Sequence, residues 1–226
     1  LPHFERQSSA VVDVIAVGTG KALRLGESGD VDAVLVHAPA AEEAFLDAGH
    51  GVRRESVMVN SFEIIGPEED PVGIRGMDPV AALAQIAATD ARFVSRGDDS
   101  GTHRRELELW RRGGGRPEWS NFAETGQGMG ATLVIADEMH AYTLVDRGTL
   151  LAFGHKIDLV TLVAGSSELE NPYGVLVVNG KKHPRVNQQL ANAFCDFLVS
   201  PETQRRIADF RVAGEPLFRP LQLSEF

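Results

Sequence analysis

The feature that most constrains the fold is a regular alternation of short apolar runs with amphipathic stretches. Runs such as VDAVLVHAP (31–39) are short and rich in β-branched residues, which is typical of buried strands. Stretches such as AAEEAFLDAGH (40–50) place apolar residues every three or four positions, which indicates helices. This alternation predicts an α/β fold with a mostly parallel sheet and helices on both of its faces.

The pattern continues along the whole chain, and its 226 residues leave room for two lobes. We expect residues 1–66 and 172–226 to form lobe one and residues 67–171 to form lobe two, with two crossover connections near Gly66 and Asn171. The expected elements are a strand at 11–20, a short helix or turn at 21–29, a strand at 31–39, a helix at 40–50, a long strand pair at 53–67, a helix at 78–90, a strand at 91–95, helices at 102–112 and 131–144, strands at 157–165 and 173–179, and helices at 186–200 and 200–212.

Charge and composition exclude several classes of function. The net charge is −10, from 22 basic and 32 acidic residues, whereas binding to nucleic acid or to an anionic membrane favours a basic excess. The single cysteine, Cys195, forms no internal disulfide and no cysteine-based metal site, and the seven histidines lack the spacing of a zinc site. No run of 18 apolar residues is present, and we expect no signal peptide within these residues.

Three expected helices begin at glycine-rich turns, at residues 18–20, 100–102 and 126–130. None of them has the Glu or Gln, three residues after a Ser or Thr, that would complete a capping box. Their first N–H groups are therefore available to an anion, because a helix N-terminus concentrates donors and positive potential. Arg96, just before the second turn, adds a planar fork of donors that suits an oxyanion.

The residues around Arg96 leave more than one interpretation open. Asp98 and Asp99 are unexpected beside an anion, and they fit a role in holding Arg96, in capping the helix or in accepting a hydrogen bond from hydrogen phosphate. Sulfate, molybdate or tungstate would need donors only. Ser100 and His103, with one of these aspartates, also suggest a hydrolase.

Four segments together resemble the periplasmic tungstate-binding proteins of bacterial tungstate ABC transporters. They are VIAVGTGKALRLGESGDVDAVLVHAP, FVSRGDDSGTHRRELELW, GQGMGATLVIADEMHAYTLVDRGT and LENPYGVLVVN, and the similarity covers nearly the whole chain. The resemblance implies a type II periplasmic-binding-protein fold, which has two α/β lobes with the ligand in the cleft between them. It also implies a monomeric receptor outside the cytoplasm that is not an enzyme, has no cofactor or metal, and delivers tungstate or molybdate to a permease in the inner membrane.

The resemblance also implies a set of ligand residues. Two lie in the first lobe and six in the second: Thr19, Gly20, Arg96, Ser100, Gly101, Thr102, Met129 and Gly130. Members of that family begin with a strand that carries a TTTS segment, and we expect lobe one of this chain to lack it. The alternatives to tungstate are a receptor of the same fold for molybdate, sulfate or phosphate, the Ser100–His103 hydrolase, and a cytoplasmic oxyanion sensor.

Overall fold

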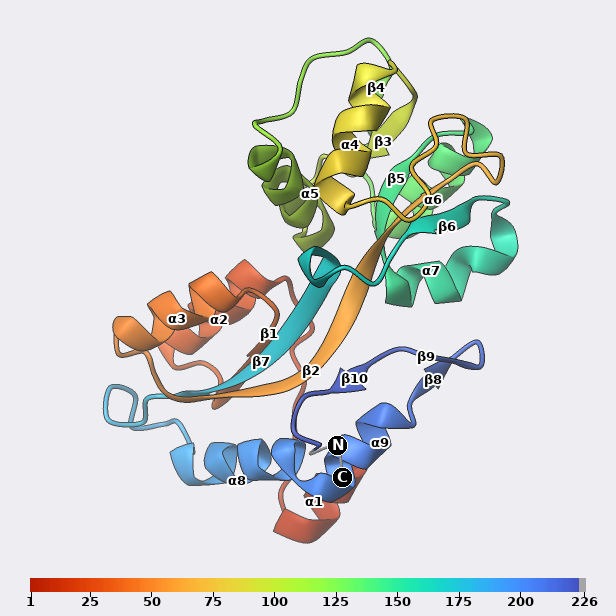
Figure 1. Ribbon diagram of the computed structural model, residues 1–226. Coiled ribbons are helices and arrows are strands. Elements are labelled where there is room, and N and C mark those ends of the chain that lie inside the picture. Colours follow the sequence, from red (N-terminus) through yellow and green to blue (C-terminus); the bar gives the residue numbers. More distant parts are fainter. Residues whose placement is uncertain (224–226) are drawn as a thin grey trace. The chain divides into compact units, whose positions relative to one another are not determined.

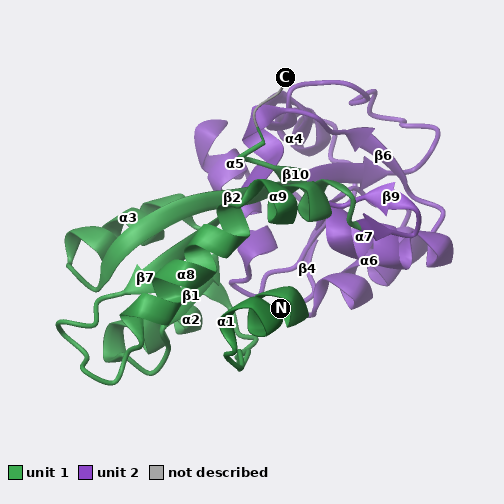
Figure 2. Ribbon diagram, turned by 90° about the horizontal axis from the view of Figure 1, so that it is seen from below, with its two compact units in different colours: residues 1–59, 172–210, 218–226 green, residues 60–171, 211–217 purple. Residues whose placement is uncertain are grey.

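The computed structural model describes residues 1–223 and divides the chain into two compact units (Figures 1 and 2). Unit 1 comprises residues 1–59, 172–210 and 218 onward, and unit 2 comprises residues 60–171 and 211–217. One boundary thus falls between Asn171 and Pro172, at the predicted crossover. The other falls between Val59 and Asn60 rather than at Gly66, because one continuous strand runs through it. Residues 211–217 also belong to unit 2, which the two-crossover scheme did not include.

Unit 1 is built on a sheet with the strand order β1-β7-β2-β10. Alternate residues of β7 face opposite layers, as the pleat of a strand requires. Leu176 and Val178 pack with α2 and α3, whereas Val175 and Val177 pack with α8. Figure 1 shows α2 and α3 on one side of this sheet and α8 on the other. The elements are α1 (Pro2–Ser8), α2 (Thr19–Ser28), β1 (Ala33–Val36), α3 (Pro39–Asp47), β2 (Gly51–Gly66), β7 (Glu170–Val178), α8 (Gln188–Val199), α9 (Pro201–Ala208) and β10 (Arg219–Pro220).

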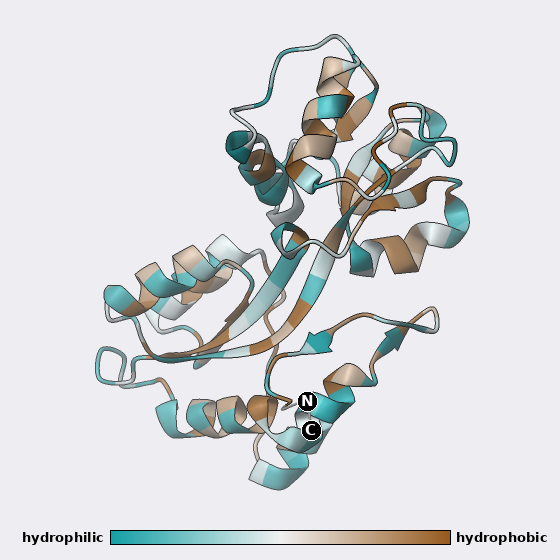
Figure 3. Ribbon diagram, in the orientation of Figure 1, coloured by the Kyte–Doolittle hydropathy of each residue, from teal (hydrophilic) through white to brown (hydrophobic). Residues whose placement is uncertain are grey.

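Unit 2 has the same layered plan around the second half of β2. Ile64 faces a core formed with α4 and α5, and Ile65 faces a core formed with α6. Figure 3 shows hydrophobic residues concentrated on the strands of unit 2, whereas its helices carry both hydrophobic and hydrophilic positions. The elements are α4 (Pro79–Ala88), β3 (Phe93–Ser95), α5 (Gly101–Arg112), β4 (Phe122–Glu124), α6 (Met129–Glu138), β5 (Thr143–Asp146), α7 (Arg147–Phe153), η1 (Gly154–Lys156), β6 (Val160–Val163), η2 (Ser167–Leu169), β8 (Arg211–Val212) and β9 (Glu215–Pro216).

The prediction of a mostly parallel sheet is wrong for the long strands. The pairs β1–β7, β2–β10, β2–β5 and β2–β6 are all antiparallel. Parallel pairing occurs between β3 and β4, which are joined through α5, and at the bridge between Phe93 and Tyr142. The βαβ rule therefore holds where a helix joins neighbouring strands, and it fails where β2 pairs with strands distant in the sequence.

Four predicted elements differ from the structure. The helix predicted for 200–212 ends at Ala208, and Arg211–Val212 form β8. Residues 11–18 are not a strand, and Val11 is 84% exposed there, since an apolar alternation becomes a strand only beside a pairing partner. Residues 53–67 belong to one strand, β2, rather than to a strand pair. The helix predicted for 131–144 ends at Glu138, because His140 adopts a left-handed φ of 46°, and the remaining residues lead into β5.

Helix starts with a conventional cap follow the sequence. Asp78 accepts hydrogen bonds from the N–H groups of Val80 and Ala81 at the start of α4. Ser200 accepts one from Thr203 at the start of α9.

None of the helices within residues 1–223 has the length and apolar character that a membrane span requires.

One buried carboxyl of unit 2 differs from its counterparts. Glu42 and Glu63 are buried but paired with Arg54 and Arg147. Glu106 of α5 is 2% exposed, and its hydrogen bonds within the described residues come from two neutral donors, the Ser95 hydroxyl and the Trp110 indole. Burial is the main reason that the pKa of Glu106 is raised to about 7. The carboxyl therefore titrates near neutral pH.

We expect Glu106→Gln to change the pH dependence of stability. Because the folded-state pKa lies above the unfolded value, the folded protein binds the extra proton between these two values, and Glu106 makes stability fall as pH rises toward about 7. The slope contributed by one such group reaches about 1.4 kcal/mol per pH unit. Urea unfolding of the parent and of Glu106→Gln at several pH values should show this slope in the parent and its loss in the variant. Equal slopes would contradict the assignment.

Candidate ligand-binding site

The parallel pairing of β3 with β4 determines where two of the helix starts lie. Ser95 is opposite Glu124 at the carboxyl ends of these strands, and each strand leads through a short loop into a helix, α5 or α6. The two loops are also bonded to each other, since the N–H of Gly126 donates to the carbonyl of Arg96 at 2.8 Å. Unit 2 therefore brings Arg96, the start of α5 and the start of α6 to one edge.

The guanidinium of Arg96 is held on one side and unsatisfied on another. Its Nη2 donates to the carboxylate of Asp98, whereas its buried Nε has no hydrogen-bond partner in the described residues. A buried donor without a partner costs on the order of 1–3 kcal/mol, and more when the group is charged. The free Nε–H is the strongest sign of a missing acceptor in this loop.

The two aspartates that looked wrong for an anion site are both engaged by cations. Asp98 also accepts a hydrogen bond from the N–H of Ser100 at 3.2 Å. Burial opposes its ionisation, but hydrogen bonds from Ser100 and the charge of Arg96 outweigh burial and hold the pKa of Asp98 below its ordinary value. Asp99 forms a two-pronged pair with Arg104, at 2.9 and 2.8 Å, which lowers its pKa as well. Asp98 therefore pairs with Arg96 and holds it in place, whereas Asp99 pairs with Arg104.

The start of α5 lacks a capping box, as the sequence indicated, but Ser100 caps it. The hydroxyl of Ser100 accepts a hydrogen bond from the N–H of His103 at 3.3 Å, so this side chain serves the helix. Gly101 and Thr102 follow as the first helical residues, and their N–H groups have no hydrogen-bond partner in the described chain. This turn therefore retains two backbone donors.

The start of α6 has no side-chain cap, as the sequence interpretation expected. The side chain of Met129 is 5% exposed and belongs to the core with Leu133 and Val145. At Gly130 a Cβ atom would lie 2.6 Å from the ring of Phe153, so packing requires a glycine. These two predicted residues can offer an anion their backbone N–H groups, because their side-chain positions serve the core.

Thr19 and Gly20 belong to unit 1, at the start of α2. Gly18 is the N-cap, and no side chain caps this helix. The N–H groups of Lys21 and Ala22 bond to the carbonyl of Gly18, each at 3.0 Å, and those of Thr19 and Gly20 have no partner among the described residues. The prediction of an open helix start is confirmed here.

The hydrolase constellation is not assembled. The hydroxyl of Ser100 caps α5, and Nδ1 of His103 accepts a hydrogen bond from the N–H of Asp99 at 3.0 Å. Both aspartate carboxylates are paired with arginines rather than with the imidazole. A nucleophile, base and orienter in hydrogen-bond sequence are what such catalysis requires, so this alternative loses its geometric support.

Ser95, which precedes the Arg96 loop (residues 96–100), and its partner Glu106 were absent from the sequence interpretation. The hydroxyl of Ser95 donates to Glu106 at 2.7 Å and accepts from the N–H of Gly97 at 3.3 Å. A signal for Glu106 did exist, since it lies on the buried stripe of α5 with Thr102 and Trp110, spaced by four residues. A carboxylate on such a stripe indicates an internal polar network.

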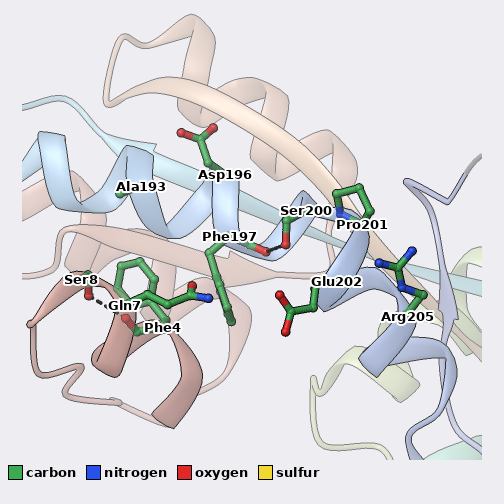
Figure 4. Close-up of a pocket in the computed structure, with 10 residues that line it drawn as sticks. All are labelled: Phe4, Gln7, Ser8, Ala193, Asp196, Phe197, Ser200, Pro201, Glu202 and Arg205. Carbon is green, nitrogen blue, oxygen red and sulfur yellow. Dashed lines mark hydrogen bonds between the residues drawn. The ribbon is translucent and has the colours of Figure 1, made fainter.

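A separate hollow of about 650 Å³ lies in unit 1 among α1, α8 and α9 (Figure 4). Phe4 and Phe197 form part of its wall, together with charged side chains such as Glu202 and Arg205. It includes none of the predicted ligand residues. In residues 1–223 no group of three or more His, Cys, Asp or Glu side chains is arranged to hold a metal ion.

Comparison with known proteins agrees with this architecture. Residues 1–202 match the family model described as a PBP superfamily domain. The tungstate-binding protein TupA of Peptoclostridium acidaminophilum is 42% identical over 225 residues, which cover 97% of this chain and 79% of that protein. A putative ABC transporter anion-binding protein of Haloferax volcanii is 48% identical over 230 residues, which cover 99% of this chain and 67% of that protein.

A solved structure gives the same result in three dimensions. The tungstate-binding protein TupA from Desulfovibrio alaskensis G20 superimposes with a TM-score of 0.91 at 45% sequence identity, covering 97% of this chain and 90% of that one. The expected periplasmic-binding-protein fold is thereby confirmed. The chain belongs to the PBP superfamily and, within it, to the family of the tungstate-binding TupA proteins.

Proposed function

We propose that this protein is an extracytoplasmic solute-binding receptor that captures tungstate, or the closely similar molybdate, and delivers it to an ABC transporter permease. The observation that carries the proposal is the buried, unpartnered Nε–H of Arg96 beside the starts of α5 and α6. The tungstate-binding names of two relatives at 42% and 45% identity give the choice of anion its support.

The donors offered by unit 2 suit a fully deprotonated oxyanion. Arg96 provides a charged N–H, and the first turns of α5 and α6 provide backbone N–H groups with the positive ends of two helix dipoles. Asp98, whose pKa is lowered, stays ionised and keeps its oxygens on Arg96 and Ser100. A donor-only shell of this kind favours tungstate or molybdate over an anion that carries a proton.

Each predicted ligand residue has a defined part in the proposal. Arg96 contributes Nε–H, and Gly101 and Thr102 contribute backbone N–H groups, while Ser100 supports them as the N-cap. Met129 and Gly130 contribute through their backbone only. From unit 1, Thr19 and Gly20 contribute the open start of α2.

The proposed receptor breaks no bond in its ligand, and we propose that it needs no cofactor and acts as a monomer. Its partner would be a permease of the inner membrane, which accepts the anion when the receptor docks. An ABC transporter anion-binding protein among the relatives supports such a partner. A receptor of the same fold for sulfate or phosphate is the competing outcome that anion selectivity decides.

We expect Arg96→Ala to weaken tungstate binding by about tenfold to a hundredfold, since a charge-assisted hydrogen bond contributes on the order of 1.5–3 kcal/mol. Arg104→Ala is the matched control, because Arg104 lies near the same loop but its exposed guanidinium pairs with Asp99. Equilibrium dialysis with tungsten analysis measures both affinities. An Arg96→Ala protein that binds like the parent would remove Arg96 from the site.

We expect Thr19→Val to weaken tungstate binding about fivefold, because the substitution removes one hydroxyl donor at the open start of α2. Thr19→Ser keeps a hydroxyl and should retain most of the affinity. Circular dichroism melting checks that both variants stay folded. If Thr19→Val matches Thr19→Ser in dialysis, the loop contributes only its backbone.

A further inference from the structure

The carboxyl of Glu106 lies one helical turn beyond the start of α5 and points into unit 2. Glu106 is 2% exposed and shares the buried face of α5 with Thr102 and Trp110. Its Oε1 accepts from the Trp110 indole at 3.3 Å, and its Oε2 accepts from the Ser95 hydroxyl at 2.7 Å. It is therefore a buried carboxyl bonded to Ser95, the residue that precedes Arg96 of the proposed site.

Ser95 connects this carboxyl to the backbone on both sides of Arg96. A hydroxyl has one proton to donate and two lone pairs. Since Ser95 gives its proton to Glu106, its lone pairs face elsewhere, and one accepts the N–H of Gly97 at 3.3 Å. Gly97 has a φ of 60°, and a Cβ atom there would lie 2.7 Å from Glu124, so this position of the loop requires a glycine.

Besides burial, two charged groups act on the ionisation of Glu106 in opposite directions. Arg116, in the loop after α5, favours the carboxylate, and Glu124 of β4 opposes it. These two side chains approach each other at 3.9 Å, which weakens the effect of both. From β3 the carboxyl meets only the neutral Ser95, and α4, which packs on α5, has no ionisable side chain between Pro79 and Ala88. β5 also packs on α5, and its one ionisable group, the carboxylate of Asp146, accepts hydrogen bonds from Thr149.

We propose that Glu106 positions the Arg96 loop through Ser95 and that its proton occupancy regulates oxyanion affinity. The proposal rests on the proposed function for its ligand and on the hydrogen-bonded chain Glu106–Ser95–Gly97 for its geometry. Protonation on one carboxyl oxygen leaves the other to accept the Ser95 proton. With the proton on Oε1, which faces the longer Trp110 contact, the Ser95 hydrogen bond persists in both states, and the charge next to the loop changes.

The direction of the coupling follows from electrostatics. A dianion held at Arg96 and at the start of α5 repels the carboxylate of Glu106 and favours its protonated form. Anion binding therefore takes up a proton, and affinity falls as pH rises through the titration of Glu106. For one linked proton the change is at most about tenfold per pH unit. Because burial places this pKa at about 7, the coupling acts near neutral pH.

Three variants separate charge from position. Glu106→Gln is uncharged but keeps an oxygen for Ser95, so we expect an affinity for sodium tungstate that changes less than about 1.5-fold from about pH 6.5 to pH 8.5, against threefold or more in the parent. Ser95→Ala removes the link, so we expect a several-fold loss of affinity with the pH slope retained. Glu63→Gln, a buried carboxylate paired with Arg147, is the control and should keep the parent slope.

A second readout requires no ligand. In the free protein, the backbone N–H of Gly97 should shift in a ¹H–¹⁵N spectrum with a midpoint near pH 7, and this titration should vanish in Glu106→Gln. A Glu106→Gln protein with the parent pH slope, or a Gly97 signal that does not titrate, overturns the inference. If the parent binds no tungstate, the proposed function fails, and the Gly97 titration alone then decides the role of Glu106.

Discussion

The parallel pairing of β3 with β4 is the constraint on which the unit 2 site depends. Because both strands end at the same edge, with Ser95 opposite Glu124, the helices that follow them begin side by side. The hydrogen bond from Gly126 to the carbonyl of Arg96 fixes the two loops together. The starts of α5 and α6, with their backbone donors, therefore follow strands that end at one edge of unit 2. The cores beneath, with Ile64 and Ile65 on opposite faces, hold this edge in place.

On this frame, a few polar contacts prepare one cation for a ligand. Asp98 fixes one nitrogen of Arg96 and leaves the buried Nε without a partner. An unsatisfied buried donor is costly, and it persists in a folded protein when its neighbours hold it in place. Ser95, which is bonded to Glu106, contributes to that restraint by accepting a hydrogen bond from the N–H of Gly97. The same carboxyl brings a titratable charge close to the position proposed for a dianion.

Features set by neighbouring residues could be predicted from the sequence, whereas contacts between distant residues could not. The helix starts at Thr19 and Met129 and the cap at Asp78 follow from nearby glycine, hydroxyl and carboxylate residues. The antiparallel partners of β2 are far away in the sequence, so no local pattern predicts them. The predicted ligand residue Met129 has its side chain in the core, and the pairing of Asp98 with Arg96 was one of several open roles for the aspartates. The burial of Glu106 could have been predicted from its spacing with Thr102 and Trp110 on α5, but the sequence interpretation did not include it.

The most direct test of the receptor account is calorimetric titration of the unmodified chain with sodium tungstate, repeated in excess sulfate and in excess phosphate. The account predicts saturable binding of one anion per chain that molybdate displaces and that sulfate and phosphate leave nearly unchanged. The donor-only shell disfavours a protonated phosphate, and the tungstate-binding relatives support the choice over sulfate. Absence of saturable binding, or displacement by phosphate as effective as by molybdate, would contradict it.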